Sequence, residues 1–451
     1  MSESRITIIG GGLAGCEAAW QAAQQNMPVT LYDMKPGKYS PAHSSELLAE
    51  LVCSNSFRSD NPYSAVGLLK EEMRLLDSLI MRAAEKTKVP AGKALAVDRQ
   101  QFADFITEKI TGHPLVKVIR EEITTLPPPA DNHLLIIATG PLTSSPLAQS
   151  LKEITGPNLA FYDAIAPIVA ADSLDFNIIY QASRYDEGPG DYLNCPFSRE
   201  EYLNFIQALA TAEKVPLKEF EEKKYFEGCL PIEVMLERGD DTLRFGPMKP
   251  VGLPDPRTGK DPYAVVQLRK ENLAGTYYNM VGFQTKLTWP AQKQVFRLIP
   301  GMAKAEFARL GSIHRNTFVC GPRVLLPTLQ CKNRPDVLLA GQLTGVEGYV
   351  ESAAMGILAG INSSLLQKNS AVTIPPPETA FGALIHHLTT TEAQKFQPSN
   401  INFGLFPPIG KKMAKKMRGQ YRYKKAIDAL RQWREKISSQ TNRHDEPAHN
   451  Q

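Results

Sequence analysis

The sequence has little of what marks several common protein classes. Six cysteines are spread over 451 residues without a Cys-x-x-Cys spacing, so neither a disulfide framework nor a zinc cluster is expected. The eight histidines form no His-Glu-x-x-His pattern, so no metal site is expected. The longest apolar stretch, 353–366, is too short for a membrane span and contains two glycines and an asparagine. Because the N-terminus shows no basic leader before its first apolar run, we expect a cytosolic protein.

Charge is plentiful but unevenly placed. Hydrophobic residues make up 43% of the chain and charged residues 22%, which is ordinary for a globular protein long enough for several domains. The net charge is only +4, yet residues 411–436 hold eleven Lys/Arg against two acidic residues. This asymmetry indicates an anionic macromolecular partner.

A dinucleotide-binding motif stands at the N-terminus. An apolar β-branched run at 6–9 leads into Gly10-Gly11-Gly12-Leu13-Ala14-Gly15, then an alanine-rich helical pattern, then a second strand at 28–32 that ends at Asp33. In such βαβ units the first glycine makes the tight turn, the second admits a pyrophosphate and the third lets helix and strand pack closely. The helix N-terminus favours phosphate, and an acid in the place of Asp33 accepts hydrogen bonds from a ribose.

Two later segments favour FAD over NAD as the dinucleotide. The strand 134–138 ends in Thr139-Gly140, and the strand 337–340 ends in Gly341-Gln342 before a helix of small residues over 348–366. Each segment alone is also consistent with a buried strand followed by a turn. Together with the N-terminal motif they predict a flavoprotein with a further pair of cofactor contacts at each strand end.

The predicted architecture is α/β. We expect a Rossmann-like FAD-binding domain built from residues 1–182 and 314–370, with an inserted α+β domain at 183–313 that binds substrate or RNA. A basic, helical C-terminal tail is expected over 371–451, after the triple proline at 375–377. Long amphipathic helices are predicted over 67–86 and 199–213, and a shorter one over 216–224.

Four motifs resemble one known family. They are Cys-Ser-Asn-Ser-Phe-Arg at 53–58, Phe-Glu-Gly-Cys-Leu-Pro-Ile-Glu at 226–233, Phe-Gly-Pro-Met-Lys-Pro-Val-Gly-Leu at 245–253 and Gly-Val-Glu-Gly-Tyr-Val-Glu-Ser-Ala-Ala at 345–354. Their order and content are similar to those of the folate- and FAD-dependent tRNA (uracil-5-)-methyltransferases, the TrmFO family. The larger GidA/MnmG flavoproteins of tRNA wobble-uridine modification share the glycine motif and the Gly341 region.

The resemblance implies an enzyme that forms 5-methyluridine at position 54 in the T-loop of tRNA. The carbon would come from 5,10-methylenetetrahydrofolate, with bound FAD and with NAD(P)H as reductant. It also implies that Cys53 and Cys229 are the catalytic pair, one as the nucleophile and the other assisting proton transfer. Thiolate addition at uracil C6 makes C5 nucleophilic, and a second group must then accept the C5 proton. The residues alone favour the simpler interpretation that both cysteines are small buried hydrophobic side chains, and only the resemblance reverses this.

Further candidates carry polar, aromatic or basic groups. Tyr349 is a candidate for stacking on the folate, and Arg58, Asn55 and Lys286 are candidates for contact with folate or RNA. In the tail, an apolar stripe is predicted to pack on the body and to leave basic residues for the tRNA phosphates. These residues are Lys411, Lys412, Lys415, Lys416, Arg418, Arg422, Lys424 and Lys425.

Other functions remain open at this point. One is a flavoprotein oxidoreductase that acts on a small molecule without RNA, and another is an MnmG-like enzyme of wobble-uridine modification. A third is an RNA-binding flavoprotein without catalysis. The sequence does not decide which cysteine attacks, whether NADH or NADPH is used, or which protein partners and oligomeric state the chain has.

Overall fold

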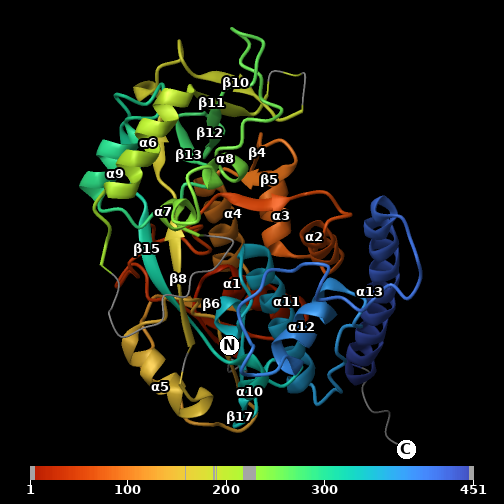
Figure 1. Ribbon diagram of the computed structural model, residues 1–451. Coiled ribbons are helices and arrows are strands. Elements are labelled where there is room, and N and C mark those ends of the chain that lie inside the picture. The colour runs from red at the N-terminus through yellow and green to blue at the C-terminus, as the bar shows by residue number, and fades with distance from the viewer. Residues whose placement is uncertain (1–5, 158, 186–187, 189, 217–229, 446–451) are drawn as a thin grey trace, which may run out of the picture.

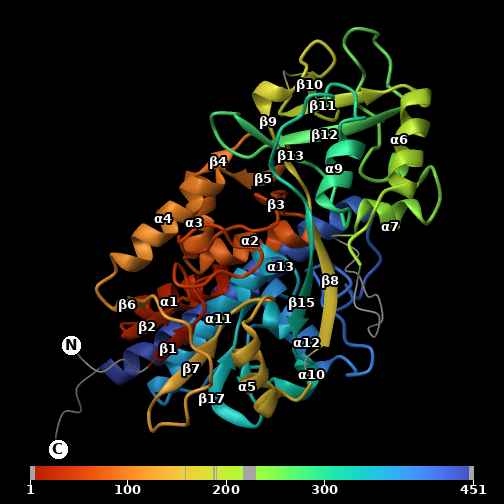
Figure 2. The same cartoon turned by 90° about the vertical axis from the view of Figure 1, so that its left-hand side faces the viewer.

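The computed structural model divides into two parts that long strands connect (Figures 1 and 2). It describes residues 6–445 except 158, 186–187, 189 and 217–229. A parallel sheet covered by helices forms the lower part in Figure 1, and an antiparallel sheet with its own helices forms the upper part. Each part has its own hydrophobic core.

The parallel sheet carries the predicted nucleotide-binding unit. Its strand order is β16-β17-β7-β1-β2-β6, with β1 at the centre and only β16 running antiparallel to its neighbour. The strands are β1 (Ile6–Ile9), β2 (Val29–Tyr32), β6 (Val116–Ile119), β7 (Leu134–Ile137), β16 (Gln330–Cys331) and β17 (Arg334–Leu339). The carboxyl ends of β1, β2, β7 and β17 therefore meet at one edge, where open α/β sheets bind ligands.

Two helices of small residues pack against this sheet and against each other. The helices α1 (Leu13–Gln24) and α11 (Tyr349–Gln367) are almost entirely buried. A side chain at Gly356 would lie 2.3 Å from the Ala14 carbonyl oxygen, and one at Gly360 would lie 2.6 Å from that of Ala18. Glycine at these positions lets the two helix backbones approach closely and fixes where α1 begins.

The helix predicted over 67–86 is wrong as a single element. The chain forms α2 (Ala65–Leu75) and α3 (Leu79–Lys86), with a left-handed residue, Asp77, between them. The Ser78 side chain caps α3, and the buried Glu17 carboxylate of α1 accepts hydrogen bonds from the Ser78 hydroxyl and from the first amides of α3. Because the Glu17 carboxylate that holds Ser78 and the start of α3 belongs to another helix, periodicity alone could not reveal the break.

The upper part is an antiparallel sheet in the order β10-β11-β12-β13-β9-β14. Its strands are β9 (Ile168–Ala170), β10 (Tyr180–Ala182), β11 (Tyr192–Phe197), β12 (Ala264–Lys270), β13 (Tyr277–Met280) and β14 (Phe307–Arg309). The helices around it are α6 (Arg199–Thr211), α7 (Ile232–Leu236), α8 (Thr242–Phe245) and α9 (Trp289–Phe296). The sheet takes its first strand at Ile168, before the predicted boundary at 183. The helix predicted over 216–224 lies almost wholly outside the described residues.

Long antiparallel strands connect the two parts. The strands β8 (Leu159–Ile165) and β15 (Ser312–Phe318) pair along their whole length and run between the lower and upper parts (Figures 1 and 2). A second connection is the small sheet β3-β5-β4, which lies next to the upper sheet. Its strands are β3 (Ser56–Ser59), β4 (Lys88–Val89) and β5 (Ala94–Val97), and β5 is followed by α4 (Arg99–Thr111).

The C-terminal region packs on the lower part. The remaining helices are α5 (Ser145–Thr155), α10 (Gly321–Val324), α12 (Ala380–Thr390) and α13 (Lys415–Asp445). Helix α13 lies along α2 (Figure 1), with Ala426, Leu430 and Trp433 buried and the Trp433 indole donating to the Thr373 carbonyl. Within the described residues, no helix is both long and apolar enough to cross a membrane.

Candidate cofactor cleft and the Cys53 loop

A cleft opens at the carboxyl edge of the parallel sheet. It encloses about 1120 Å³, part of it open to solvent, and contains most of the residues predicted to bind the cofactor. Those that line it are Gly10, Gly11, Gly12, Leu13, Ala14, Asp33, Thr139, Gly140, Gly341 and Gln342. Tyr349 lines the cleft as well, so four segments far apart in sequence meet around one space.

The glycines of the first turn have three different steric roles. Gly10 has a positive φ of 111°, and a side chain there would lie 2.5 Å from the Ala138 carbonyl oxygen. Gly15 faces away from the cleft, where a side chain would lie 1.8 Å from the Gly10 carbonyl oxygen. At Gly12, which precedes α1, no heavy atom lies within 4 Å of the added atom. The space beside Gly12 and the helix N-terminus suit a phosphate group.

Asp33 sits where β2 ends and is almost fully buried. Its Oδ1 accepts a hydrogen bond of 2.8 Å from the Lys35 amide, and its Oδ2 faces Gly11, where a side chain would clash with it. A carboxylate fixed in this way beside the glycine turn can accept hydrogen bonds from a hydroxylated ligand.

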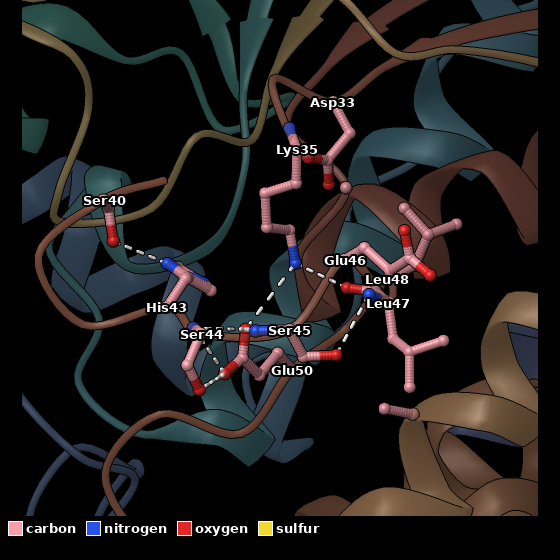
Figure 3. A network of polar contacts seen from close by, with 12 residues as sticks. Asp33, Lys35, Ser40, His43, Ser44, Ser45, Glu46, Leu47, Leu48 and Glu50 are labelled. Carbon is pink, nitrogen blue, oxygen red and sulfur yellow. Dashed lines mark hydrogen bonds and ion pairs between the residues drawn. The ribbon is translucent and has the colours of Figure 1, made fainter. Parts of the chain in front are cut away.

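A partly buried polar network lines this side of the cleft (Figure 3). Lys35 Nζ donates to the Leu47 carbonyl and lies 3.8 Å from Glu50 Oε2. Glu50 also accepts from the amides of Ser44 and Ser45, which orders the loop after His43. His43 lines the cleft, and burial together with the nearby Lys35 charge lowers the pKa of its imidazole. Sequence reasoning missed this network, since isolated Lys, His and Glu residues in a loop carry no spacing signal.

At the other end of the cleft, the lining residue Gln342 is held by a buried acid. Gln342 donates 2.6 Å to Glu347 Oε2, and burial raises the pKa of Glu347 well above its usual range, with the Asp163 carboxylate adding to the effect. Gly341 has a positive φ of 72° and would bring a side chain within 2.8 Å of the Ala14 Cβ. The end of β17 therefore lies against the start of α1.

Cys53 belongs to a loop at the edge of the cleft. Its neighbour Val52 lines the cleft, and the Tyr349 hydroxyl accepts from the amides of Cys53 at 2.7 Å and Ser54 at 3.2 Å. The Tyr349 ring packs at 5.9 Å from Phe57. Tyr349 thus ties α11 to the Cys53 loop while it lines the cleft.

One substrate candidate needs correction. Asn55 is fully buried, and its amide donates to the carbonyls of Val97 and Lys270 while its oxygen accepts from Arg269. Its polar atoms therefore hold the loop and do not face folate or RNA. The Arg58 guanidinium is partly exposed and paired with the fully buried Glu351 carboxylate, and its contact with folate or RNA stays a prediction.

The other predicted site residues outside the tail lie away from the cleft or outside the described residues. Lys286 lies 3.8 Å from Glu237, in the antiparallel part, and its amide donates to Glu233. Cys229 falls outside the described residues. Among the described part of the chain, no group of three or more His, Cys, Asp or Glu is arranged to hold a metal ion.

The basic tail residues divide into two kinds. Arg422 is half-buried, donates to the Pro407 carbonyl and stacks at 5.4 Å over the rings of both Phe403 and Phe406. It packs the tail, and its role as a phosphate ligand stays a prediction. The others are exposed: Lys411, Lys412, Lys415, Lys416, Arg418, Lys424 and Lys425. Lys411 lies over the ring of Tyr421 at 4.4 Å.

Comparison with known proteins gives close relatives over nearly the whole length. The chain is 63% identical over 434 residues to the methylenetetrahydrofolate–tRNA-(uracil-5-)-methyltransferase TrmFO of Desulfotalea psychrophila, covering 96% of this chain and 98% of that protein. It is 59% identical over 429 residues to the TrmFO of Geobacter sulfurreducens, covering 95% and 98%. The chain belongs to the TrmFO family.

The same TrmFO-family chain matches a broader family and its fold. Residues 5–371 match the family described as glucose inhibited division protein A. Two crystal forms of Aquifex aeolicus GidA align with TM-scores of 0.70 and 0.71, at 16% and 17% identity. These alignments cover 96% and 98% of this chain and 73% and 78% of GidA. The TrmFO-family chain therefore has a GidA-like α/β fold.

Proposed function

We propose that this TrmFO-family chain forms 5-methyluridine at position 54 in the T-loop of tRNA, in the cytoplasm. The carbon donor is methylenetetrahydrofolate, the bound cofactor is FAD and the reductant is NAD(P)H. The observation that carries the proposal is identity of 63% and 59%, over nearly full length, to two proteins named as this methyltransferase.

The residues of the cleft fit FAD. Gly12 and the N-terminus of α1 offer space and amide donors for the pyrophosphate, and Asp33 offers a carboxylate for the ribose. Thr139, Gly140, Gly341 and Gln342 line the part of the cleft that leads toward Tyr349. When bound, FAD supplies the redox chemistry that turns a folate-borne methylene into a methyl group.

The chain's own contribution to the chemistry centres on two thiols. Cys53 stands beside the cleft on a loop whose amides Tyr349 fixes. As the nucleophile, a cysteine adds to uracil C6, and after carbon transfer a base takes the C5 proton so that the C6–sulfur bond breaks. We assign these steps to Cys53 and Cys229 as a pair, with their order open.

The inserted domain and the basic tail are proposed to bind tRNA. Seven exposed lysines and arginines stand near the start of α13, and Arg422 of this helix packs against Phe403 and Phe406 of the loop before it. Segment 399–401 then reaches the cleft edge, where the Ile401 amide donates to Glu351 and Asn400 donates to the Glu347 carbonyl. The tail thus continues from the cleft edge to a basic surface suited to phosphates. The domain limits at 182, 313 and 370 stay predictions.

One assay separates this function from the alternatives. Purified protein is supplied with FAD, NAD(P)H, methylenetetrahydrofolate and a tRNA transcript, and nucleosides are analysed for 5-methyluridine. A transcript with cytidine at position 54 serves as the control and is expected to remain unmethylated. NAD(P)H oxidation by a small substrate without RNA would instead identify an oxidoreductase, and tRNA binding without methylation a non-catalytic flavoprotein.

A further inference from the structure

The loop that carries Cys53 is held from several directions by long-range side chains. From α11, the Tyr349 hydroxyl accepts from the Cys53 and Ser54 amides. From α4, the Arg99 guanidinium donates to the Leu51 carbonyl. From β12, Arg269 Nη2 donates 2.8 Å to the Ser54 hydroxyl and Arg269 Nε donates 2.9 Å to Asn55 Oδ1.

The Arg269 contacts join the two parts of the molecule. Arg269 stands on a strand of the antiparallel sheet, 214 residues from Asn55 in sequence. Asn55 reinforces the junction, because its amide donates to the carbonyls of Lys270 in the antiparallel sheet and Val97 in the small sheet. The conformation after Cys53 therefore depends on where the antiparallel sheet sits.

The stability of the fold does not explain why an arginine occupies position 269. Arg269 is only 6% exposed, and the two side chains to which it donates are neutral. The nearby Glu271 carboxylate forms its ion pair with Arg99, at 2.9 Å. Burial lowers the pKa of Arg269, which shows the cost of keeping its charge away from water. A buried charge without a carboxylate partner of its own is expensive, so an apolar residue would serve packing better.

We propose that Arg269 is a positioning residue that holds the Ser54–Asn55 segment to the antiparallel sheet and so fixes Cys53 at the edge of the cleft. Tyr349 binds the backbone amides of Cys53 and Ser54, and Arg269 binds the side chains of Ser54 and Asn55. This proposal rests on the proposed function, since it concerns the placement of a thiol for methyl transfer. It makes the active geometry depend on contact between the two parts of the chain.

The test substitutes Arg269→Lys, which keeps the charge but cannot make both hydrogen bonds with one rigid fork. The first readout is the rate at which iodoacetamide alkylates Cys53 in the FAD-loaded protein without tRNA, measured on the peptide that contains it. We expect the rate to rise about tenfold, as loss of one charge-assisted hydrogen bond loosens a loop. The second readout is kcat, which should fall about 100-fold while KM for tRNA is unchanged, because the reacting thiol is displaced.

The control is Arg257→Lys, which removes guanidinium contacts to Asp255 within the same antiparallel part and away from the loop. It should change neither readout. Ser54→Ala removes the hydroxyl that accepts from Arg269 and also from the Ser56 amide. It should speed alkylation in the same direction, so unchanged alkylation in this variant overturns the proposal even if Arg269→Lys does not fold. Unchanged Cys53 alkylation in the folded variants would overturn the proposal. Absence of methyl transfer by the wild type would contradict the proposed function. The rate of Cys53 alkylation would still test the role of Arg269, because it does not depend on methyl transfer.

Discussion

At the scale of single residues, the glycines of the turn at 10–15 have different structural roles, although the sequence does not distinguish them. A side chain at Gly15 would collide with the Gly10 carbonyl, whereas one at Gly12 would enter empty space in the cleft. The first position constrains folding and the second constrains what can bind. Substitution at the two sites should therefore separate cofactor binding from stability.

We expect Gly12→Val to lose FAD while the protein stays folded. The branched side chain would occupy the space that suits the pyrophosphate, and its Cβ would have no protein heavy atom within 4 Å beyond its chain neighbours. Flavin absorbance of the purified protein and its far-ultraviolet circular dichroism measure the two properties. Gly15→Val is the matched control and should lower folded yield, because its side chain has no room. Retention of full FAD by folded Gly12→Val would contradict the assignment of the cleft.

Cys53→Ala should abolish methylation and leave FAD bound. The thiol is not part of the glycine turn, and its loop is held through backbone amides and neighbouring side chains that the substitution keeps. Nucleoside analysis of tRNA and the flavin spectrum measure the outcome. Cys331→Ala is the control, since that cysteine is buried and burial raises the pKa of its thiol to about 12. Near wild-type methylation by Cys53→Ala would refute the thiol mechanism.

At the scale of elements, one buried ion pair anchors α2 to the loop after β3. Lys70 is fully buried and lies 3.0 Å from Asp60, which Arg74 also approaches at 3.2 Å. Burial alone would raise the pKa of Asp60, but the Lys70 and Arg74 contacts outweigh it and lower that pKa below its usual value. Asp60 therefore stabilises the fold above its unfolded pKa, and this stabilisation is lost as pH falls through the folded value.

Asp60→Asn should cost about 3 kcal/mol at neutral pH, since it leaves Lys70 buried without its carboxylate. The difference from wild type should begin to shrink as pH falls below the normal Asp pKa of about 4, and should be lost once pH passes the lower pKa of folded Asp60, where its carboxylate becomes neutral. Urea unfolding followed by circular dichroism at both pH values measures it. The control Asp77→Asn breaks the exposed pair with Arg82 and should cost less than about 1 kcal/mol. Equal losses for the two variants would contradict this account of Lys70.

A structural feature could be predicted from the sequence where the residues that determine it are close together in the chain. The βαβ unit with its glycine turn and Asp33 was predictable, because strand, turn, helix and acid follow one another within a few dozen residues. The break between α2 and α3 was not, because the acid that caps α3 is Glu17. The role of Asn55 was likewise misjudged, because Arg269 and Lys270 come from a distant strand.

At the scale of the whole molecule, the basic end of α13 is predicted to dominate the salt dependence of tRNA binding. Replacing Lys411, Lys412, Lys415 and Lys416 with glutamine should weaken binding, and each lost phosphate contact should flatten the log–log salt slope by about 0.7–0.9. Filter binding over a salt series measures the slope. Glutamine at Arg431, Arg434 and Lys436 removes similar charge from the far half of the same helix and should leave the slope nearly unchanged. Equal effects at the two ends would mean that only net charge matters.

The central claim is that this chain moves a folate carbon to one uridine of tRNA, and carbon labelling tests it most directly. Methylenetetrahydrofolate labelled with ¹³C in its methylene group is supplied with NAD(P)H, the FAD-loaded protein and unmodified tRNA. Mass spectrometry of nuclease fragments should find the label in 5-methyluridine at position 54 and nowhere else, and labelled S-adenosylmethionine should give none. Label at the wobble position, or no label in tRNA while the protein is folded and carries FAD, would contradict the account.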